Sequence, residues 1–169
     1  MTSPRSTFTV RARPEEIVNE EQERFEIGIR YLPHYEGLEP ISRQTPGSSG
    51  FDLRAACSDT IVIRPGRAAI VPAGFELSIP EGCEAQVRPR SGLALKSRIG
   101  LLNSPGTIDS DYRGEVCMIV YNFGEQDYIV RRGIRLAQMV FQKLPAVSLV
   151  ERTELDRTDR GAGGFGHTG

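Results

Sequence analysis

Histidine and cysteine are scarce in this chain of 169 residues. The two histidines, His34 and His167, are too few for a histidine-rich metal centre, and they disfavour a Ser-His-Asp catalytic triad. The three cysteines are odd in number and widely spaced, which argues against a disulfide framework and against a zinc site. We therefore expect Cys57, Cys83 and Cys117 to be buried free thiols in a reducing cytosol.

The chain also lacks a charge imbalance and a long apolar run. Its formal net charge is −1, so it has no global basic field to attract nucleic acid. No apolar stretch is long enough to cross a membrane, and none follows Met1–Arg5 as it would in a secretory signal. We expect a cytoplasmic protein without membrane or nucleic-acid partners.

Glycine and proline, in contrast, are abundant, with 18 and 11 residues that indicate many turns. The length suits one domain with a sizeable core. Short apolar runs between the turns predict an all-β fold, a jelly-roll-like β-sandwich or barrel of short strands with one short helix. The expected strands are Phe25–Tyr31, Thr60–Ile63, Ala68–Val71, Phe75–Ile79, Glu84–Arg88, Glu115–Asn122, Tyr128–Val130, Leu136–Gln142 and Ala146–Val150.

The short helix is expected at Ser91–Lys96. Ser91 is a residue type that caps helix N-termini, and the charge of Lys96 suits a last helical turn. A helix start that carries Arg90 and a serine hydroxyl is a natural phosphate site. The same residues also fit an ordinary capped turn without a ligand.

Both ends of the chain differ from its middle. Residues 1–24 form a charged N-terminal arm, which is either solvated or disordered, or a short helix that starts at Pro14. The β domain spans residues 25–158, and residues 159–169 form a glycine-rich tail that we expect to be mobile. Arg160 suits a phosphate and Phe165 suits a base, so the tail is either a nucleotide lid or a floppy terminus. A Walker-type ATP site is disfavoured, because no Lys-Ser/Thr pair ends the glycine run.

The segment Gly106–Gly114 is the most informative part of the chain. It places a carboxylate, Asp109, close to an aromatic ring, Tyr112, between two glycines that indicate tight turns or close approach to a ligand. A carboxylate on such a turn can activate water, and the ring offers a flat face to a sugar or base. The alternative is a polar hairpin with one packed tyrosine.

Five segments of the chain form an ordered set of short motifs. The segments are Gly50–Ala56, Pro89–Ala94, Asn103–Gly114, Gly133–Gln138 and the tail Asp159–Gly169. They resemble, in the same order, the five motifs of the homotrimeric dUTP pyrophosphatase (dUTPase) family. One short motif would be weak, whereas five in register are highly specific. The resemblance covers the chain from about Phe25 onward and leaves the N-terminal arm without a role.

The resemblance implies a jelly-roll subunit, a homotrimer with shared active sites, and hydrolysis of dUTP to dUMP and pyrophosphate with Mg²⁺ on the phosphates. This activity limits uracil incorporation into DNA and supplies dUMP for thymidylate synthesis. Asp109 would be the general base that activates water for attack on the α-phosphate, a task that suits a carboxylate ionised at neutral pH. Tyr112 would pack against the deoxyribose and leave no space for a 2′-hydroxyl.

The resemblance also assigns the residues that hold the substrate and the metal. The hairpin Asn103–Asp109 would read uracil mostly with backbone groups and be too tight for the methyl group of thymine. Asp52 would support the Mg²⁺ site through water. The other implied positions are Arg90, Ser91, Gly92 and Gln138 at the phosphates, Gly106, Thr107 and Ile108 in the uracil hairpin, Arg160 on the terminal phosphate, and Phe165 with Gly166 over the uracil.

Several alternatives stay open at this point. In a purely structural interpretation Asp52 caps a turn, Arg90 makes an internal ion pair and Gln138 is a buried polar group on a strand. A related enzyme, dCTP deaminase, shares the Arg-Ser pair and part of the third motif, but the Asp-Tyr-Arg-Gly segment and the Phe165 tail favour the pyrophosphatase. A non-enzymatic nucleotide-binding trimer is disfavoured, because Asp109 and the tail are intact.

Overall fold

Short antiparallel strands make up most of the structure, a computed structural model that describes residues 25–164. No helix in this described range is long and apolar enough to span a bilayer. The elements are β1 Gly28–Tyr31, the 3₁₀ helix η1 Pro33–Tyr35, β2 Phe51–Arg54, β3 Ile61–Ile63, β4 Ala68–Pro72, β5 Phe75–Ser78, β6 Cys83–Pro89, α1 Ser91–Ser97, β7 Ile99–Leu101, β8 Gly106–Ile108, β9 Cys117–Asn122, β10 Tyr128–Val130 and β11 Arg135–Lys143.

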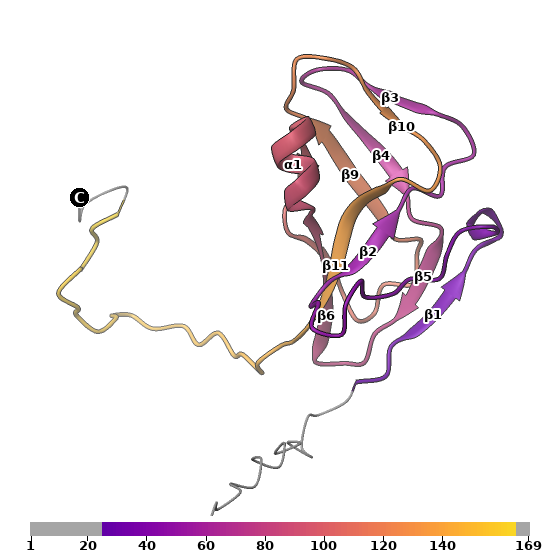
Figure 1. Cartoon of the computed structure of the whole chain (residues 1–169). Helices are drawn as coiled ribbons and strands as arrows, with labels where there is room; N and C mark the ends of the chain where they lie inside the picture. Colours follow the sequence, from indigo (N-terminus) through magenta and orange to yellow (C-terminus); the bar gives the residue numbers. More distant parts are fainter. Residues whose placement is uncertain (1–24, 165–169) are drawn as a thin grey trace, which may run out of the picture.

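The strand β11 organises the largest sheet. The strands of this sheet have the order β2-β11-β6-β8, so β11 pairs with β2 on one side and with β6 on the other (Figure 1). A three-stranded sheet, β4-β9-β7, and the pairs β1-β5 and β10-β3 complete the fold. Buried side chains of both larger sheets, among them Leu53, Met139, Val71 and Met118, form one hydrophobic core. The predicted jelly-roll-like all-β class, with one short α-helix in the described residues, is confirmed.

The strand predicted at Ala146–Val150 is wrong. After β11 the chain follows an extended path away from the sheets (Figure 1), and the side chains of Val147 and Leu149 are 72% and 97% exposed. Alternating apolar residues form a strand only beside a partner, and no strand of residues 25–164 pairs with this segment. The prediction also missed β2, β7 and β8, which are only three or four residues long and carry charges or glycine.

Two local predictions also need correction. Helix α1 begins at Ser91 instead of being capped by it, because the extended residue before it, Arg90, is the N-cap and makes no side-chain cap hydrogen bond. All three cysteines are free, and Cys57 and Cys83 are buried as expected, but Cys117 is exposed. Successive side chains of a strand point to opposite faces, and Cys117 occupies an outward position on β9.

Asn122 is the buried polar side chain in the core of the described residues, with 1% exposure. Its Nδ2 donates hydrogen bonds to the carbonyls of Ile63 and Gln126, both at 2.8 Å. Its Oδ1 accepts the N–H of Gly124 at 2.9 Å. These three bonds close the turn after β9 and attach it to β3, so every polar atom of the side chain has a partner.

We expect Asn122→Ala to lower the free energy of unfolding by about 2–4 kcal/mol, because buried carbonyls and one N–H lose their partners. Gln126→Ala is the matched control, since its side chain is exposed and only its backbone carbonyl takes part. Urea denaturation followed by circular dichroism measures both. Equal midpoints for the two variants would contradict the role of this network.

Candidate active site

The register of the largest sheet places three predicted site segments side by side. Gln138 on β11 lies opposite Asp52 on β2 and opposite Arg88 on β6. Two residues after Arg88, the chain leaves β6 and enters α1 at Arg90. The first, second and fourth motif-like segments therefore meet at one end of this sheet.

Asp52, Arg90 and Arg135 form an ion-pair group that we call the Asp52 cluster. Asp52 Oδ1 lies 3.2 Å from Arg90 Nε, and Asp52 Oδ2 accepts a hydrogen bond from Arg135 Nη1 at 2.9 Å. The Asp52 side chain is only 13% exposed. Two guanidinium groups around one carboxylate leave a net positive charge, which favours an anionic ligand. Arg90 therefore makes an internal ion pair, as the purely structural interpretation of the sequence expects, and its partner is Asp52.

Arg135 is a member of this cluster that sequence reasoning missed. It lies three residues from Gln138, so a regular strand would point the two side chains to opposite faces. The register of β11 shifts between Arg135 and Ala137, and this irregularity lets Arg135 reach Asp52. The available signal was an arginine at the first position of a largely apolar strand.

Further contacts fix the surroundings of the cluster. Arg135 Nη1 also donates to Gln44 Oε1 at 3.0 Å, and Arg90 Nη1 donates to the Arg135 carbonyl at 3.2 Å. Burial raises the pKa of the Tyr128 hydroxyl, and the nearby charge of Arg90 acts in the opposite direction.

Gln138 is held by the backbone around it. Its Nε2 donates to the Pro89 carbonyl at 2.9 Å. A Cβ atom at Gly50 would lie 2.4 Å from Gln138 Oε1, so a side chain at position 50 would displace the Gln138 amide from this position. Gln138 is half-buried rather than fully buried.

The start of α1 is exposed to solvent at Ser91 and Gly92. The first intrahelical N–H donors are Leu93 and Ala94, which both bond to the carbonyl of Arg90. The N–H groups of Ser91 and Gly92 therefore lie outside the helical ladder, beside the Asp52 cluster. Backbone donors in this position can bind the oxygens of an anion.

Asp109 lies on a second, separate part of the surface. It directly follows β8 and is exposed, and its carbonyl accepts the N–H of Tyr112 at 3.2 Å in a tight turn. The Arg113 guanidinium closes the turn with bonds to the carbonyls of Ser110 at 2.6 Å and Tyr112 at 2.9 Å. Asp109 opens onto a polar hollow that is lined by Ile79, Glu81, Cys83, Asp109, Ser110, Asp111, Arg113 and Leu144.

Tyr112 folds back over the chain that follows it. Its hydroxyl donates to the carbonyl of Glu115 at 3.0 Å, and the side chain keeps 47% of its surface exposed. The ring covers Gly114, where an added Cβ would lie 2.4 Å from the Tyr112 Oη. The aromatic face is therefore positioned by backbone atoms and is accessible to a ligand.

The hairpin before Asp109 is narrow. A Cβ at Gly106 would lie 3.1 Å from Asn103 Nδ2 and 3.3 Å from the Asn103 carbonyl oxygen. Thr107 and Asn103 are exposed, whereas Ile108 is buried and anchors the strand. This arrangement presents mostly backbone groups next to Asp109.

The Asp52 cluster and Asp109 are far apart within one chain. Ile108 pairs with Ala85 on β6, whereas Arg90 follows five residues after Ala85. Five strand residues span about 17 Å. Arg160 is also remote, since the extended chain after β11 leads away from the sheets (Figure 1) and Arg160 Nε donates to the Gly163 carbonyl. Phe165 and Gly166 lie outside the described residues.

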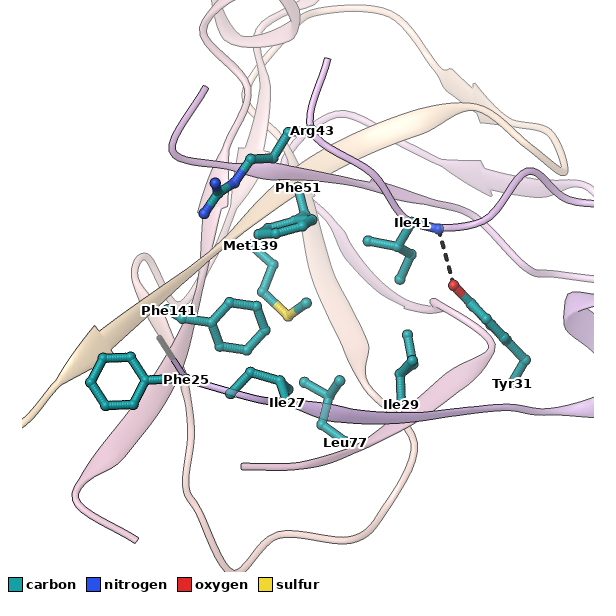
Figure 2. A pocket seen from close by; sticks show the side chains of 10 residues that line it. All are labelled: Phe25, Ile27, Ile29, Tyr31, Ile41, Arg43, Phe51, Leu77, Met139 and Phe141. Atoms are coloured by element: carbon teal, nitrogen blue, oxygen red, sulfur yellow. Dashed lines mark hydrogen bonds between the residues drawn. The ribbon is translucent and has the colours of Figure 1, made fainter. Parts of the chain in front are cut away.

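An apolar groove of about 600 Å³ lies elsewhere, between β1, β5 and β11 (Figure 2). Phe51 and Phe141 meet edge to face there with ring centroids 5.8 Å apart. The Arg43 guanidinium lies 4.9 Å from the Phe51 ring centroid. The lining residues are Phe25, Ile27, Ile29, Tyr31, Ile41, Arg43, Phe51, Leu77, Met139 and Phe141, and none of them is a predicted site residue.

Residues 25–164 contain no group of three or more His, Cys, Asp or Glu side chains that could hold a metal ion. Both oxygens of Asp52 already face arginines. Within the described residues, Asp52 is therefore paired with protein cations and is not part of such a group.

Comparison with known proteins identifies the family. The dUTPase family model matches residues 38–169. The chain belongs to the dUTPase family. It is 51% identical over 145 residues to the deoxyuridine 5′-triphosphate nucleotidohydrolase of Brucella melitensis, covering 85% of this chain and 92% of the relative. It is 55% identical over 127 residues to the protein of the same name from Caulobacter vibrioides, covering 74% and 82%.

Solved dUTPase structures share the fold of this dUTPase family member. A mutant dUTPase of Staphylococcus bacteriophage 80alpha, solved with dUpNHpp, superposes with a TM-score of 0.76 at 22% identity, covering 85% of this chain and 98% of that one. A mutant dUTPase from phage phi11 of S. aureus, described with a structural Mg(II) ion, superposes with a TM-score of 0.68 at 22% identity, covering 76% and 97%.

We expect Gly114→Ala to displace the Tyr112 ring in this dUTPase family member, because the new methyl group would overlap the Tyr112 hydroxyl. The fold should persist, since the loop is exposed and Tyr112 can rotate outward. A crystal structure of the variant measures the position of the ring, and thermal melting checks the fold. An unmoved ring that still bonds to Glu115 would refute the expectation.

Proposed function

We propose that this chain is a dUTP diphosphatase, which hydrolyses dUTP to dUMP and pyrophosphate. The observation that carries the proposal is the family match across residues 38–169, which include both the Asp52 cluster and the Asp109 turn. In the cell this reaction would limit uracil incorporation into DNA and provide dUMP for thymidylate synthesis. Asp109, Arg90 and Tyr112 carry its main steps.

The Asp52 cluster and the start of α1 would bind the triphosphate. Arg90 and Arg135 supply two guanidinium groups against the one carboxylate of Asp52, so the cluster carries a net positive charge. Ser91 and Gly92 add backbone N–H groups beside them, with Gln138 as a further polar contact. Neutralising the phosphate oxygens is the main requirement for attack at phosphorus.

Asp109 would act as the general base. It is exposed to solvent on a turn that backbone bonds hold in shape, so it can orient a water molecule and accept its proton. The water would attack the α-phosphorus, and pyrophosphate would leave. Ser91 would lie near the leaving oxygen.

Tyr112 and the hairpin before Asp109 would select the nucleoside. The Tyr112 ring would pack against the deoxyribose, where a 2′-hydroxyl would clash with it. Asn103, Gly106, Thr107 and Ile108 would read uracil through backbone groups, and the close approach of Gly106 to Asn103 supports a slot too tight for a 5-methyl group.

Mg²⁺ would enter this site bound to the substrate. When bound, it would neutralise charge on the triphosphate oxygens. Asp52 would support it through water, which agrees with a carboxylate whose two oxygens already face arginines.

We propose a homotrimer in which subunits share each active site. Two observations support this assembly. The Asp52 cluster and Asp109 are about 17 Å apart along β6 within one chain, too far for both to act on one α-phosphate. The extended segment after β11 exposes Val147 and Leu149, and the groove of Figure 2 offers apolar surface that a second copy can cover.

The tail, residues 159–169, would close over the bound nucleotide. Arg160 would clamp the terminal phosphate, while Phe165 and Gly166 would cover the uracil. The described start of the tail is exposed, and contacts with the ligand would therefore drive its ordering. Closure would exclude water from the phosphates.

The deciding experiment is pyrophosphate release from dUTP by the full chain, with and without Mg²⁺. We expect Asp109→Asn to slow hydrolysis by roughly 10²-fold or more while dUTP binding persists, the usual scale for a lost general base. Asp127→Asn is a control that removes a carboxylate on the turn between β9 and β10. Near-normal turnover of Asp109→Asn would remove Asp109 from the mechanism, and ammonia release from dCTP would instead favour the deaminase.

Truncation after Thr158 tests the tail and the assembly together. The truncated chain should fold and assemble with the same number of subunits as the full chain, whose trimer has a mass of three times 18.7 kDa, because none of residues 159–164 belongs to the core. It should lose most of its dUTPase activity. Light scattering and dUTP turnover measure the two outcomes. A monomeric full chain would refute the shared site, and full activity after truncation would refute the lid.

A further inference from the structure

His34 lies on η1 and has no role in the reaction proposed above. Its Nε2 lies 2.7 Å from Glu115 Oε1, and the two residues are 81 positions apart in the sequence. Because an ionised carboxylate only accepts hydrogen bonds, the histidine ring donates this one. The contact ties η1 to the end of the loop that carries Asp109 and Tyr112.

Glu115 joins this contact to the substrate loop. The same oxygen, Oε1, also accepts the N–H of Gly74 at 2.8 Å. The backbone carbonyl of Glu115 accepts the hydroxyl of Tyr112 at 3.0 Å. Glu115 therefore holds the Tyr112 ring through its backbone carbonyl, while the Glu115 side chain accepts hydrogen bonds from two donors.

The anchoring side is rigid. Gly74 has a φ of +78°, its carbonyl accepts the N–H of Leu32 at 2.9 Å, and a Cβ at this position would lie 2.6 Å from the Cβ of Ala56. Tyr35, next to His34 on η1, is only 5% exposed. In contrast, residues 109 and 111–113 are exposed. The His34–Glu115 contact therefore attaches the largely exposed loop, residues 109–113, to the packed helix η1.

We propose that His34 is a positioning residue that, through Glu115, holds the Tyr112 ring and thereby sharpens the preference for deoxyribose over ribose. This inference rests on the role of Tyr112 in the proposed function. Without the His34 bond, the Gly74 bond alone restrains the Glu115 carboxylate. The peptide unit of the Glu115 carbonyl keeps the bond from the Val116 N–H to the Phe75 carbonyl at 2.9 Å, so Tyr112 loses part of its support and its ring excludes a 2′-hydroxyl less strictly.

The test compares kcat/KM for dUTP and UTP in three variants. In His34→Ala the dUTP-to-UTP ratio should fall about fivefold, the scale of one hydrogen bond, while kcat for dUTP stays close to that of the native chain. In His34→Gln, whose amide can donate to the same carboxylate, the ratio should recover. Glu125→Gln is the matched control, because it breaks the exposed ion pair with Arg98 and should leave the ratio unchanged.

A second readout does not depend on nucleotide hydrolysis. Limited trypsin digestion should cleave after Arg113 faster in His34→Ala than in the native chain or in His34→Gln, with thermal melting as a check on folding. An unchanged ratio in His34→Ala, or equal losses in the Ala and Gln variants, would overturn the proposal. If the native chain fails to hydrolyse dUTP, the proposed function fails, and the cleavage rate after Arg113 still decides whether His34 holds the loop.

Discussion

The double pairing of β11 is the constraint on which the rest of this structure depends. Backbone hydrogen bonds to β2 and β6 fix Gln138 opposite Asp52 on one side and opposite Arg88 on the other. The same strand contributes Leu136, Ala137 and Met139 to the hydrophobic core. A one-residue slip would move these side chains out of their packed positions and Gln138 away from Asp52, so core packing and site geometry enforce the same register.

The arrangement of charged side chains at the candidate site follows from this register. Because β2, β11 and the end of β6 lie side by side, one carboxylate meets two arginines at the start of a short helix. The turn at Asp109 lies toward the opposite end of β6. The arginines of the Asp52 cluster and the Asp109 carboxylate are thus kept apart within one chain, which prevents Asp109 from pairing with these arginines.

Local patterns predicted most of the fold. Patterns of apolar residues located β4, β5, β6 and β9–β11 to within a few residues, because each of these strands buries apolar side chains. Residue types together with the family resemblance singled out Asp109 and Asp52. The relative positions of these site residues in space were not predictable, since they depend on the register between strands that are distant in the sequence. Arg135 enters the cluster through a bulge that has no sequence signal, and the Ala146–Val150 prediction failed because strand formation needs a partner that the described chain does not supply.

The shared carboxylate of Asp52 has a consequence for turnover. In the proposed reaction, an incoming polyphosphate would not meet bare guanidinium groups, because it would compete with the Asp52 carboxylate that is already bonded to both arginines. The net gain on binding is therefore a difference between two ion-pair arrangements, and it grows with the charge of the incoming group. When the triphosphate is split in the proposed reaction, each fragment would carry less charge than the intact triphosphate and would compete less well, so Asp52 would pair with both arginines again and assist departure of the products.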